Sequence, residues 1–276
     1  MGTAAGREFT SSHSPRVKAA RRLAKRAFRQ RERAFLAEGP QAAGAALGSG
    51  AEITEVFVTA DARLRYPELV AAAADAGAAV RVVSAEVMTD LAQTVTPQGL
   101  LAVCRFIDVP LERVTAGRPR LAVLLANVRD PGNAGTVLRT ADASGAQAVV
   151  FSGASVDPYN GKCVRASAGS LFHLPVVTGV DLAAGAAALR GAGMQVLAAD
   201  SRGVRSLDDV IDDGTLGAPT AWMFGNEAWG LPGQARALAD EAVSVPIYGR
   251  AESLNLATAA AVCLYASARC QRGGGR

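Results

Sequence analysis

Hydrophobic positions along the chain alternate between short apolar runs and longer stretches with an apolar side chain every three or four residues. The first pattern is typical of buried strands and the second of helices. In the N-terminal part, strands are predicted at 52–59, 78–84 and 99–106, and helices at 16–33, 40–48, 67–77 and 85–93. Further along, strands are predicted near 121–127, 147–152, 194–199, 220–224 and 242–247, and helices near 134–144, 181–191, 232–240 and 254–269.

This alternation predicts an α/β protein whose C-terminal part has a mainly parallel sheet covered by helices on both faces. A chain of 276 residues is long enough for two domains. Prolines, a glycine and several charges predict a linker at 109–119, between a small α/β domain at 16–108 and a larger domain at 120–270. Residues 1–15 and the Gly-rich end at 271–276 are predicted to be disordered.

The segment 16–33 changes the interpretation of the mild net charge of +4. It holds nine Lys or Arg and one acidic residue, a local charge of +8, so the other residues together carry −4. Such a concentration attracts a polyanion, and we favour nucleic acid over an anionic membrane because the apolar face is mostly alanine. A solvated helix face that binds nothing is the alternative. The candidate binding residues are Arg16, Lys18, Arg21, Arg22, Lys25, Arg26 and Arg29.

Composition excludes several other classes of protein. No apolar run reaches the roughly 18 residues of a membrane helix, and no apolar segment of a signal peptide follows the basic N-terminal region. The four cysteines show no C-x-x-C spacing and only two histidines are present, which predicts reduced thiols and no metal site. We therefore expect a cytoplasmic protein without a membrane partner.

Three polar, glycine-containing segments follow predicted strands of the C-terminal part. They read NVRDPGNAGTVLRTADASGA from Asn127, FGNEAWGL from Phe224 and VPIYGRAESLNLATAAAVCLY from Val245. Because the carboxyl ends of parallel strands lie at one edge of a sheet, we expect these segments to converge on one ligand. Neither the G-x-G-x-x-G of a dinucleotide fold nor the G-x-x-x-x-G-K-[ST] of a P-loop is present, which argues against a nicotinamide oxidoreductase and against a P-loop protein.

In this order, the three segments resemble the motifs of the SpoU/TrmH family of RNA ribose 2′-O-methyltransferases, part of the SPOUT class. The segment RVKAARRLAKRAFRQRERAFLAEG is similar to the RNA substrate-binding domain of many members, which resembles a ribosomal RNA-binding protein. The resemblance implies a catalytic domain with a deep trefoil knot, a rare exception among protein folds. It also implies S-adenosylmethionine as cofactor, structured RNA as partner, and a homodimer formed through the first and last helices of the C-terminal domain.

The resemblance also implies which residues form the site. The cofactor is expected to contact mainly backbone groups, at Gly225, Asn226, Val245, Ile247 and Leu254. Glycine has a physical reason to be at such a place, because without a Cβ the backbone can close upon a ligand. Arg165 matches a basic position that faces RNA phosphate, on the partner subunit. The implied catalytic set is Arg139, Asn133, Glu227, Ser253 and Asn255.

Arg139 is an unusual candidate for activating a ribose 2′-hydroxyl, because a guanidinium stays protonated up to a pKa of roughly 12. Either a nearby phosphate helps Arg139 accept the proton, or Arg139 stays charged and stabilises the developing alkoxide. Asn133 orients this arginine or the ribose, or only caps its helix. The other polar residues, Glu227, Ser253 and Asn255, either contact the methionine end of the cofactor or hold the loops together.

The predicted function is methylation of a ribose 2′-hydroxyl with S-adenosylmethionine. We prefer 23S ribosomal RNA to transfer RNA as substrate, because transfer-RNA enzymes of this family often lack the additional N-terminal domain. A transfer-RNA methyltransferase and a non-catalytic RNA-binding or assembly protein are the alternatives. The residues leave open which nucleotide is methylated, and whether methylation serves ribosome maturation or resistance to an antibiotic.

Overall fold

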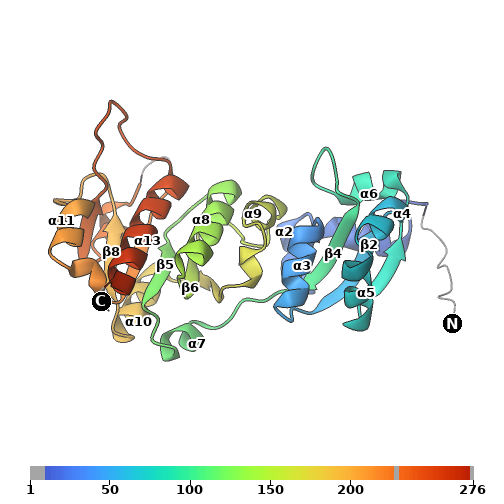
Figure 1. Cartoon of the computed structure of the whole chain (residues 1–276), viewed down its shortest axis with the longest axis horizontal. Coiled ribbons are helices and arrows are strands. Elements are labelled where there is room, and N and C mark those ends of the chain that lie inside the picture. The colour runs from blue at the N-terminus through green and yellow to red at the C-terminus, as the bar shows by residue number, and fades with distance from the viewer. Residues whose placement is uncertain (1–9, 227–229, 274–276) are drawn as a thin grey trace. The chain divides into compact units, whose positions relative to one another are not determined.

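The computed structural model describes residues 10–226 and 230–273, which form two compact units (Figure 1). The first unit comprises the chain up to Ile107 together with Tyr159–His173, and the second comprises Asp108–Pro158 and the chain from Leu174 onward. The fifteen residues Tyr159–His173 therefore interrupt the second unit along the sequence but belong to the first unit. Glu227, one of the predicted catalytic residues, lies outside the described residues.

The first unit is built on a mixed four-stranded sheet with the order β1-β4-β2-β3. Its strands are β1 (Ala34–Glu38), β2 (Ile53–Val58), β3 (Ala79–Val82) and β4 (Leu100–Arg105), and only β2 and β3 pair in parallel. Its helices are α1 (Pro15–Arg22), α2 (Arg26–Glu32), α3 (Pro40–Gly48), α4 (Ala60–Arg65), α5 (Pro67–Asp75), α6 (Ala85–Leu91) and α9 (Gly161–Ala166). Apolar side chains of α1 and α6 pack on one face of this sheet, around Phe57 and Leu101.

The basic segment 16–33 forms two helices, whereas its apolar spacing predicts one. The chain leaves α1 at Leu23 and starts α2 at Arg26. The physical reason is Arg29, which is 2% exposed and whose Nη1 donates to the carbonyl groups of Leu23 and Ala24 at 2.9 and 2.8 Å. These bonds satisfy carbonyl groups that a helix end leaves without partners.

The second unit contains a seven-stranded sheet in which every strand pair is parallel, with the order β7-β6-β5-β10-β8-β11-β9. The strands are β5 (Leu121–Leu125), β6 (Ala148–Ser152), β7 (Val176–Val180), β8 (Gln195–Ala199), β9 (Arg205–Ser206), β10 (Thr220–Phe224) and β11 (Glu241–Ser244). Residues of β5, β6, β8 and β10 are almost entirely apolar and buried, as expected for strands covered on both faces.

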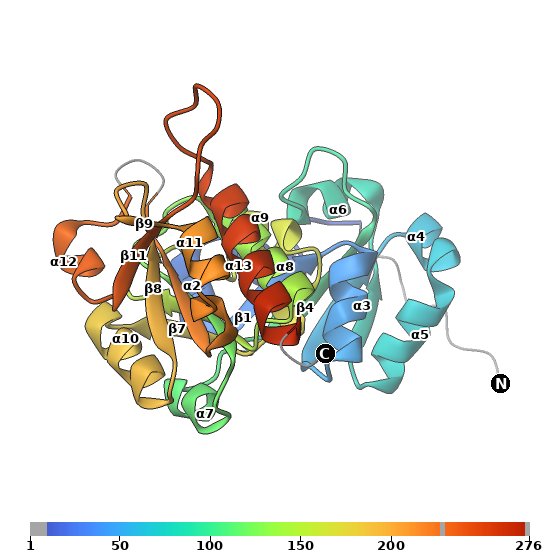
Figure 2. The same ribbon diagram turned by 60° about the vertical axis from the view of Figure 1, so that its left-hand side comes forward.

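Helices cover both faces of this sheet, which confirms the predicted α/β architecture (Figure 2). The covering helices are α7 (Leu111–Ala116), α8 (Pro131–Ser144), α10 (Leu182–Gly191), α11 (Leu207–Asp212), α12 (Gly233–Arg236) and α13 (Leu256–Gly273). On one face, α7, α10 and α12 share a core with Leu124, Val150 and Met223. On the other, α13 packs against α8 and β10, and Trp222 donates from Nε1 to Ser267 Oγ at 2.8 Å.

Several elements differ from the sequence-based prediction. The segment 109–119, predicted as a linker, contains α7, which begins after Pro110 and buries Val114. Short strands β1, β7 and β9 and helices α4, α9 and α11 are further elements that the apolar pattern did not predict. The last helix continues through Gly273, three residues beyond the predicted end of the domain at 270. Among the described residues, no helix is long and apolar enough to cross a membrane.

Candidate functional site

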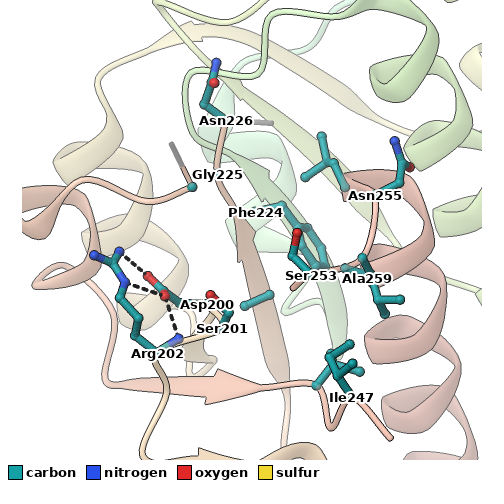
Figure 3. A pocket seen from close by; sticks show the side chains of 15 residues that line it. Asp200, Ser201, Arg202, Phe224, Gly225, Asn226, Ile247, Ser253, Asn255 and Ala259 are labelled. Atoms are coloured by element: carbon teal, nitrogen blue, oxygen red, sulfur yellow. Dashed lines mark hydrogen bonds and ion pairs between the residues drawn. The ribbon is translucent and has the colours of Figure 1, made fainter. Parts of the chain in front are cut away.

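A cavity of about 530 Å³ lies at the carboxyl edge of the second sheet, where β8, β10 and β11 end and α13 begins (Figure 3). It contains residues from the second and third polar segments, as the parallel sheet predicts. Its walls combine apolar side chains with a few polar groups, a composition typical of small-molecule sites. The lining residues are Ala199, Asp200, Ser201, Arg202, Phe224, Gly225, Asn226, Gly230, Val245, Ile247, Ser253, Leu254, Asn255, Leu256 and Ala259.

Gly225 lines the cavity, and the close approach of its own loop gives a reason for glycine in addition to the expected contact with a ligand. A Cβ on Gly225 would lie 2.5 Å from the carbonyl carbon and oxygen of Gly230 and 2.7 Å from Leu231 N. Backbone atoms cannot shift easily to relieve such a contact, whereas the end of a flexible side chain can. A valine at this position therefore distorts the loop before it meets any ligand.

Asn226 holds the loop after β10 to the first polar segment. Its backbone exchanges hydrogen bonds with Gly230, and its Nδ2 donates to the Asn127 carbonyl at 3.1 Å. Asn127 adopts a left-handed conformation with φ of 59°, which asparagine tolerates better than most residues. Because β5 and β10 are neighbouring strands, the first polar segment, which follows β5, lies next to the second polar segment, which follows β10.

Asn133 and Asn255 connect the first and third polar segments. Asn255 Nδ2 donates to Asn133 Oδ1 at 3.1 Å, and Asn255 Oδ1 accepts from the backbone N–H groups of Ala257 and Thr258 at the start of α13. The capping residue of α8 is Asp130, whose carboxylate accepts from Asn133 N at 2.7 Å. Asn133 is thus not the helix cap that sequence alone also allowed.

Asp200 and Arg202 belong to the cavity wall but were missed by sequence reasoning. The Arg202 guanidinium hydrogen-bonds the Asp200 carboxylate and holds the pKa of that carboxyl below its usual range, although burial opposes this. Arg236 adds a weaker attraction at 4.0 Å. The only sequence signal was the short spacing of acid and base in ADSRG, directly after a predicted strand.

Arg139 lies on the exposed face of α8, outside the residues that line the cavity. Within the part of the chain that the structure describes, its side chain has no hydrogen-bond or ion-pair partner. Ser253 is exposed and lines the cavity on the side opposite Asp200 (Figure 3). Of the predicted catalytic residues, the structure therefore brings Ser253 and Asn255 to the cavity and places Arg139 on α8, outside the cavity lining.

The predicted RNA-binding residues of the segment 16–33 are exposed, with one exception. Arg16, Lys18, Arg21, Arg22, Lys25 and Arg26 all present their side chains to solvent. Arg22 and Arg31 also lie over the ring of Phe28, at 5.6 and 4.9 Å from its centre, so the ring helps to orient two guanidinium groups. Arg29 is buried and bonded to carbonyl groups, and we remove it from the candidate RNA-binding set.

Arg165 is held by an acidic residue of the first unit. It lies on α9, and its Nη1 is 3.1 Å from an oxygen of Glu38, whose side chain is 8% exposed. Glu38 also accepts hydrogen bonds from Thr94 Oγ1 and from the backbone of Gln93. The carboxylate therefore partly neutralises Arg165 and fixes its position, a constraint that spacing along the sequence did not reveal.

Comparison with known families assigns both parts of the chain. Residues 120–265 match the SpoU rRNA Methylase family, and residues 14–102 match the MRM3-like substrate binding domain. The first match includes all three polar segments, and the second includes α1, α2 and the four strands of the first sheet except the end of β4.

Individual relatives and solved structures match over nearly the whole chain. The 23S rRNA (guanosine(2553)-2′-O)-methyltransferase RlmP of Bacillus subtilis is 31% identical, over 94% of this chain and 98% of the relative. The crystal structure of an AdoMet-bound rRNA methyltransferase from Sinorhizobium meliloti superposes with a TM-score of 0.82 at 31% identity, covering 95% and 97% of the two chains. The AdoMet complex of AviRb from Streptomyces viridochromogenes gives 0.78 at 29% identity, covering 95% and 100%.

Proposed function

The chain belongs to the SpoU rRNA methylase family, and from this premise we propose that it methylates a ribose 2′-hydroxyl of 23S ribosomal RNA. The reaction is that of an S-adenosylmethionine-dependent RNA 2′-O-methyltransferase. The observation that carries the proposal is the cavity at the carboxyl edge of β8, β10 and β11, where the second and third motifs of the family meet. Such an edge is the usual ligand site of a parallel sheet.

The residues of the cavity fit S-adenosylmethionine in size and in chemistry. A volume of about 530 Å³ lies within the range of small-molecule sites. Val245, Ile247 and Leu254 offer apolar walls and backbone groups to the adenine, while Ser253 and Asn255 offer hydrogen bonds to the polar end. The bound cofactor supplies an electrophilic methyl group on its sulfonium.

Arg139 is the residue that we assign to the ribose 2′-hydroxyl. Its guanidinium is exposed on α8 and is not engaged by the described residues, so it can approach the hydroxyl or the adjacent phosphate of an incoming RNA. It then stabilises the developing alkoxide by charge, or accepts the proton with help from the phosphate. Asn133 and Asn255 position α8 relative to the start of α13, and thereby set where Arg139 stands relative to the cavity.

The first unit recognises the RNA in this proposal. Its match to a substrate-binding domain and the exposed cations of α1 and α2 support this role. Because those cations contact phosphates, binding should weaken as salt concentration rises. Arg165, fixed by Glu38, is a further candidate for phosphate contact. We also propose that the reaction takes place in the cytoplasm.

Two further parts of the proposal follow from family membership. We infer a deep trefoil knot, and the return of α13 onto α8 and β10 after β11 has entered the sheet supports it. We also infer a homodimer through α8 and α13, supported by the exposed Val262 and Tyr265 on α13, at 39% and 54% exposure. Light scattering tests the dimer against the 28.2 kDa mass of one chain.

Transfer of tritiated methyl groups from S-adenosylmethionine to purified ribosomal RNA and to transfer RNA tests the proposed function. We expect labelled 2′-O-methylribose in 23S RNA, and Arg139→Ala to lower the single-turnover rate by roughly 100- to 1000-fold while both ligands still bind. Arg113→Ala, at another exposed helix arginine of the same unit, is the matched control and should retain the wild-type rate. Labelling of transfer RNA alone would contradict ribosomal RNA as the substrate and favour a transfer-RNA methyltransferase. The absence of label in any RNA would favour a non-catalytic RNA-binding protein.

A further inference from the structure

Asp200 and Arg202 form an ion pair on the wall of the cavity, directly after β8 (Figure 3). The Asp200 side chain is only 4% exposed. Its Oδ1 accepts from the backbone N–H and from Nε of Arg202, at 2.9 and 3.0 Å, and its Oδ2 accepts from Nη2 at 2.9 Å. A carboxylate this buried needs a cationic partner because desolvation penalises its charge. These three hydrogen bonds therefore hold the Asp200 and Arg202 side chains in one arrangement on the cavity wall.

The same guanidinium also reaches the loop that follows β10. Arg202 Nη2 donates to the Leu231 carbonyl at 3.0 Å. Leu231 follows Gly230, whose backbone is bonded to that of Asn226, and both Gly230 and Asn226 line the cavity. Arg202 thereby joins the segment after β8 to the segment after β10. Arg202 binds the Asp200 carboxylate and the Leu231 carbonyl at once through its planar guanidinium, and the ammonium group of a lysine cannot reproduce this geometry.

Gly203 fixes the same segment against a third strand. A Cβ on Gly203 would lie 2.6 Å from both the Ala242 carbonyl oxygen and Ser244 N, so the backbone lies directly on β11. Val245, which lines the cavity, follows this strand. The segment from Asp200 to Gly203 thus continues β8, lies against β11, and is hydrogen-bonded to Leu231 in the segment after β10.

We propose that the Asp200–Arg202 pair is a positioning device for the cofactor, which holds the segments after β8 and β10 in the binding arrangement before the cofactor arrives. This inference rests on the proposed function, because it takes S-adenosylmethionine as the ligand. Ordering a loop at the moment of binding lowers affinity, and a preformed wall avoids that loss. Arg202 does not act on the transferred methyl group. Its loss therefore raises the Kd and KM for the cofactor and leaves kcat at saturating substrates unchanged.

The same unit contains a matched control at the opposite edge of the sheet. Arg190, at the end of α10, also bridges a carboxylate and a carbonyl: its Nε donates to Asp240 Oδ1 and its Nη2 to the Leu238 carbonyl, both at 2.8 Å. Asp240 directly precedes β11, at the amino edge, and none of these three residues lines the cavity. Arg190→Ala thus removes a similar bridge without touching the site.

The experiment compares full-length wild type, Arg202→Ala, Arg202→Lys and Arg190→Ala by calorimetric titration with S-adenosylmethionine. We expect Arg202→Ala to weaken binding roughly tenfold, Arg202→Lys to give an intermediate loss, and Arg190→Ala to stay within about twofold of wild type. In steady-state assays, the KM for the cofactor should rise while kcat is retained. Hydrogen exchange of the ligand-free proteins should show faster exchange at residues 200–206 and 230–231 in Arg202→Ala alone.

Three outcomes would overturn the inference. The first is a folded Arg202→Ala protein whose cofactor affinity and loop exchange match those of wild type. The second is an equal loss in Arg190→Ala, because the effect would then reflect general stability. The third is a fall in kcat with unchanged KM. Arg202→Lys, which keeps a charge beside Asp200, decides the question if Arg202→Ala does not fold. A wild-type protein that binds no S-adenosylmethionine would instead overturn the proposed function, and this inference with it.

Discussion

Ser267→Ala tests whether α13 is attached to the sheet by the hydrogen bond from Trp222. Both residues are 0% exposed, and Trp222 Nε1 donates to Ser267 Oγ at 2.8 Å. An indole N–H can only donate, so removing the hydroxyl leaves a buried donor without an acceptor. Such a loss costs about 1–3 kcal/mol of the free energy of unfolding. For a domain of this size, each kcal/mol lowers Tm by about 2–4 °C.

The matched control is Ser144→Ala on α8. Ser144 is also buried, at 2% exposure, but its hydroxyl donates to the Ala141 carbonyl of its own helix. Both substitutions remove one hydroxyl from a helix, so their difference isolates the unpaired indole. Urea unfolding followed by circular dichroism measures both free energies. The reasoning is refuted if Ser267→Ala and Ser144→Ala lie within about 0.5 kcal/mol of each other.

Two further predictions concern titratable groups. Arg202 lowers the pKa of Asp200 in the folded protein, so the ionised Asp200 stabilises the folded state. This stabilisation is complete above the pKa of Asp200 in the unfolded chain, and it is lost as pH falls through the lower pKa of Asp200 in the folded protein. Thermal melts should therefore show stability falling below about pH 4 more steeply in wild type than in Arg202→Ala, and parallel curves would contradict this. Burial raises the pKa of the Cys104 and Cys263 thiols to about 12, so iodoacetamide at about pH 8 should spare both in the folded protein and modify the partly exposed Cys270 first. Mass spectrometry of the labelled peptides measures this, and early labelling of Cys263 would show that α13 opens.

The sequence predicted the site best where local pattern and sheet geometry act together. Apolar runs predicted β5, β10 and β11, and the convergence of parallel strands predicted that the polar segments after them share one edge. The structure confirms this shared edge, in the cavity after β8, β10 and β11 and in the hydrogen bond between Asn133 and Asn255.

Features that depend on contacts distant in sequence were not predictable. The strands β1 and β7 were not predicted although they are as long as β5, and pairing with β4 and β6 defines them. Arg29 has the same residue type and spacing as its exposed neighbours, and only its bonds to two carbonyl groups distinguish it. A Cβ on Gly225 would collide with the backbone of Gly230, and the spacing of these two glycines along the sequence does not predict that contact.

The strand order of the second sheet also affects how this protein can fold during synthesis. β10 lies between β5 and β8, and β11 lies between β8 and β9, so strands made late complete the middle of the sheet. A nascent chain that ends before Thr220 therefore exposes the apolar edges of β5 and β8. Pairings between strands distant in sequence form slowly, and open edges favour aggregation. Folding of this unit must wait until Thr220–Phe224 has left the ribosome, and until then the nascent chain is a candidate client for chaperones.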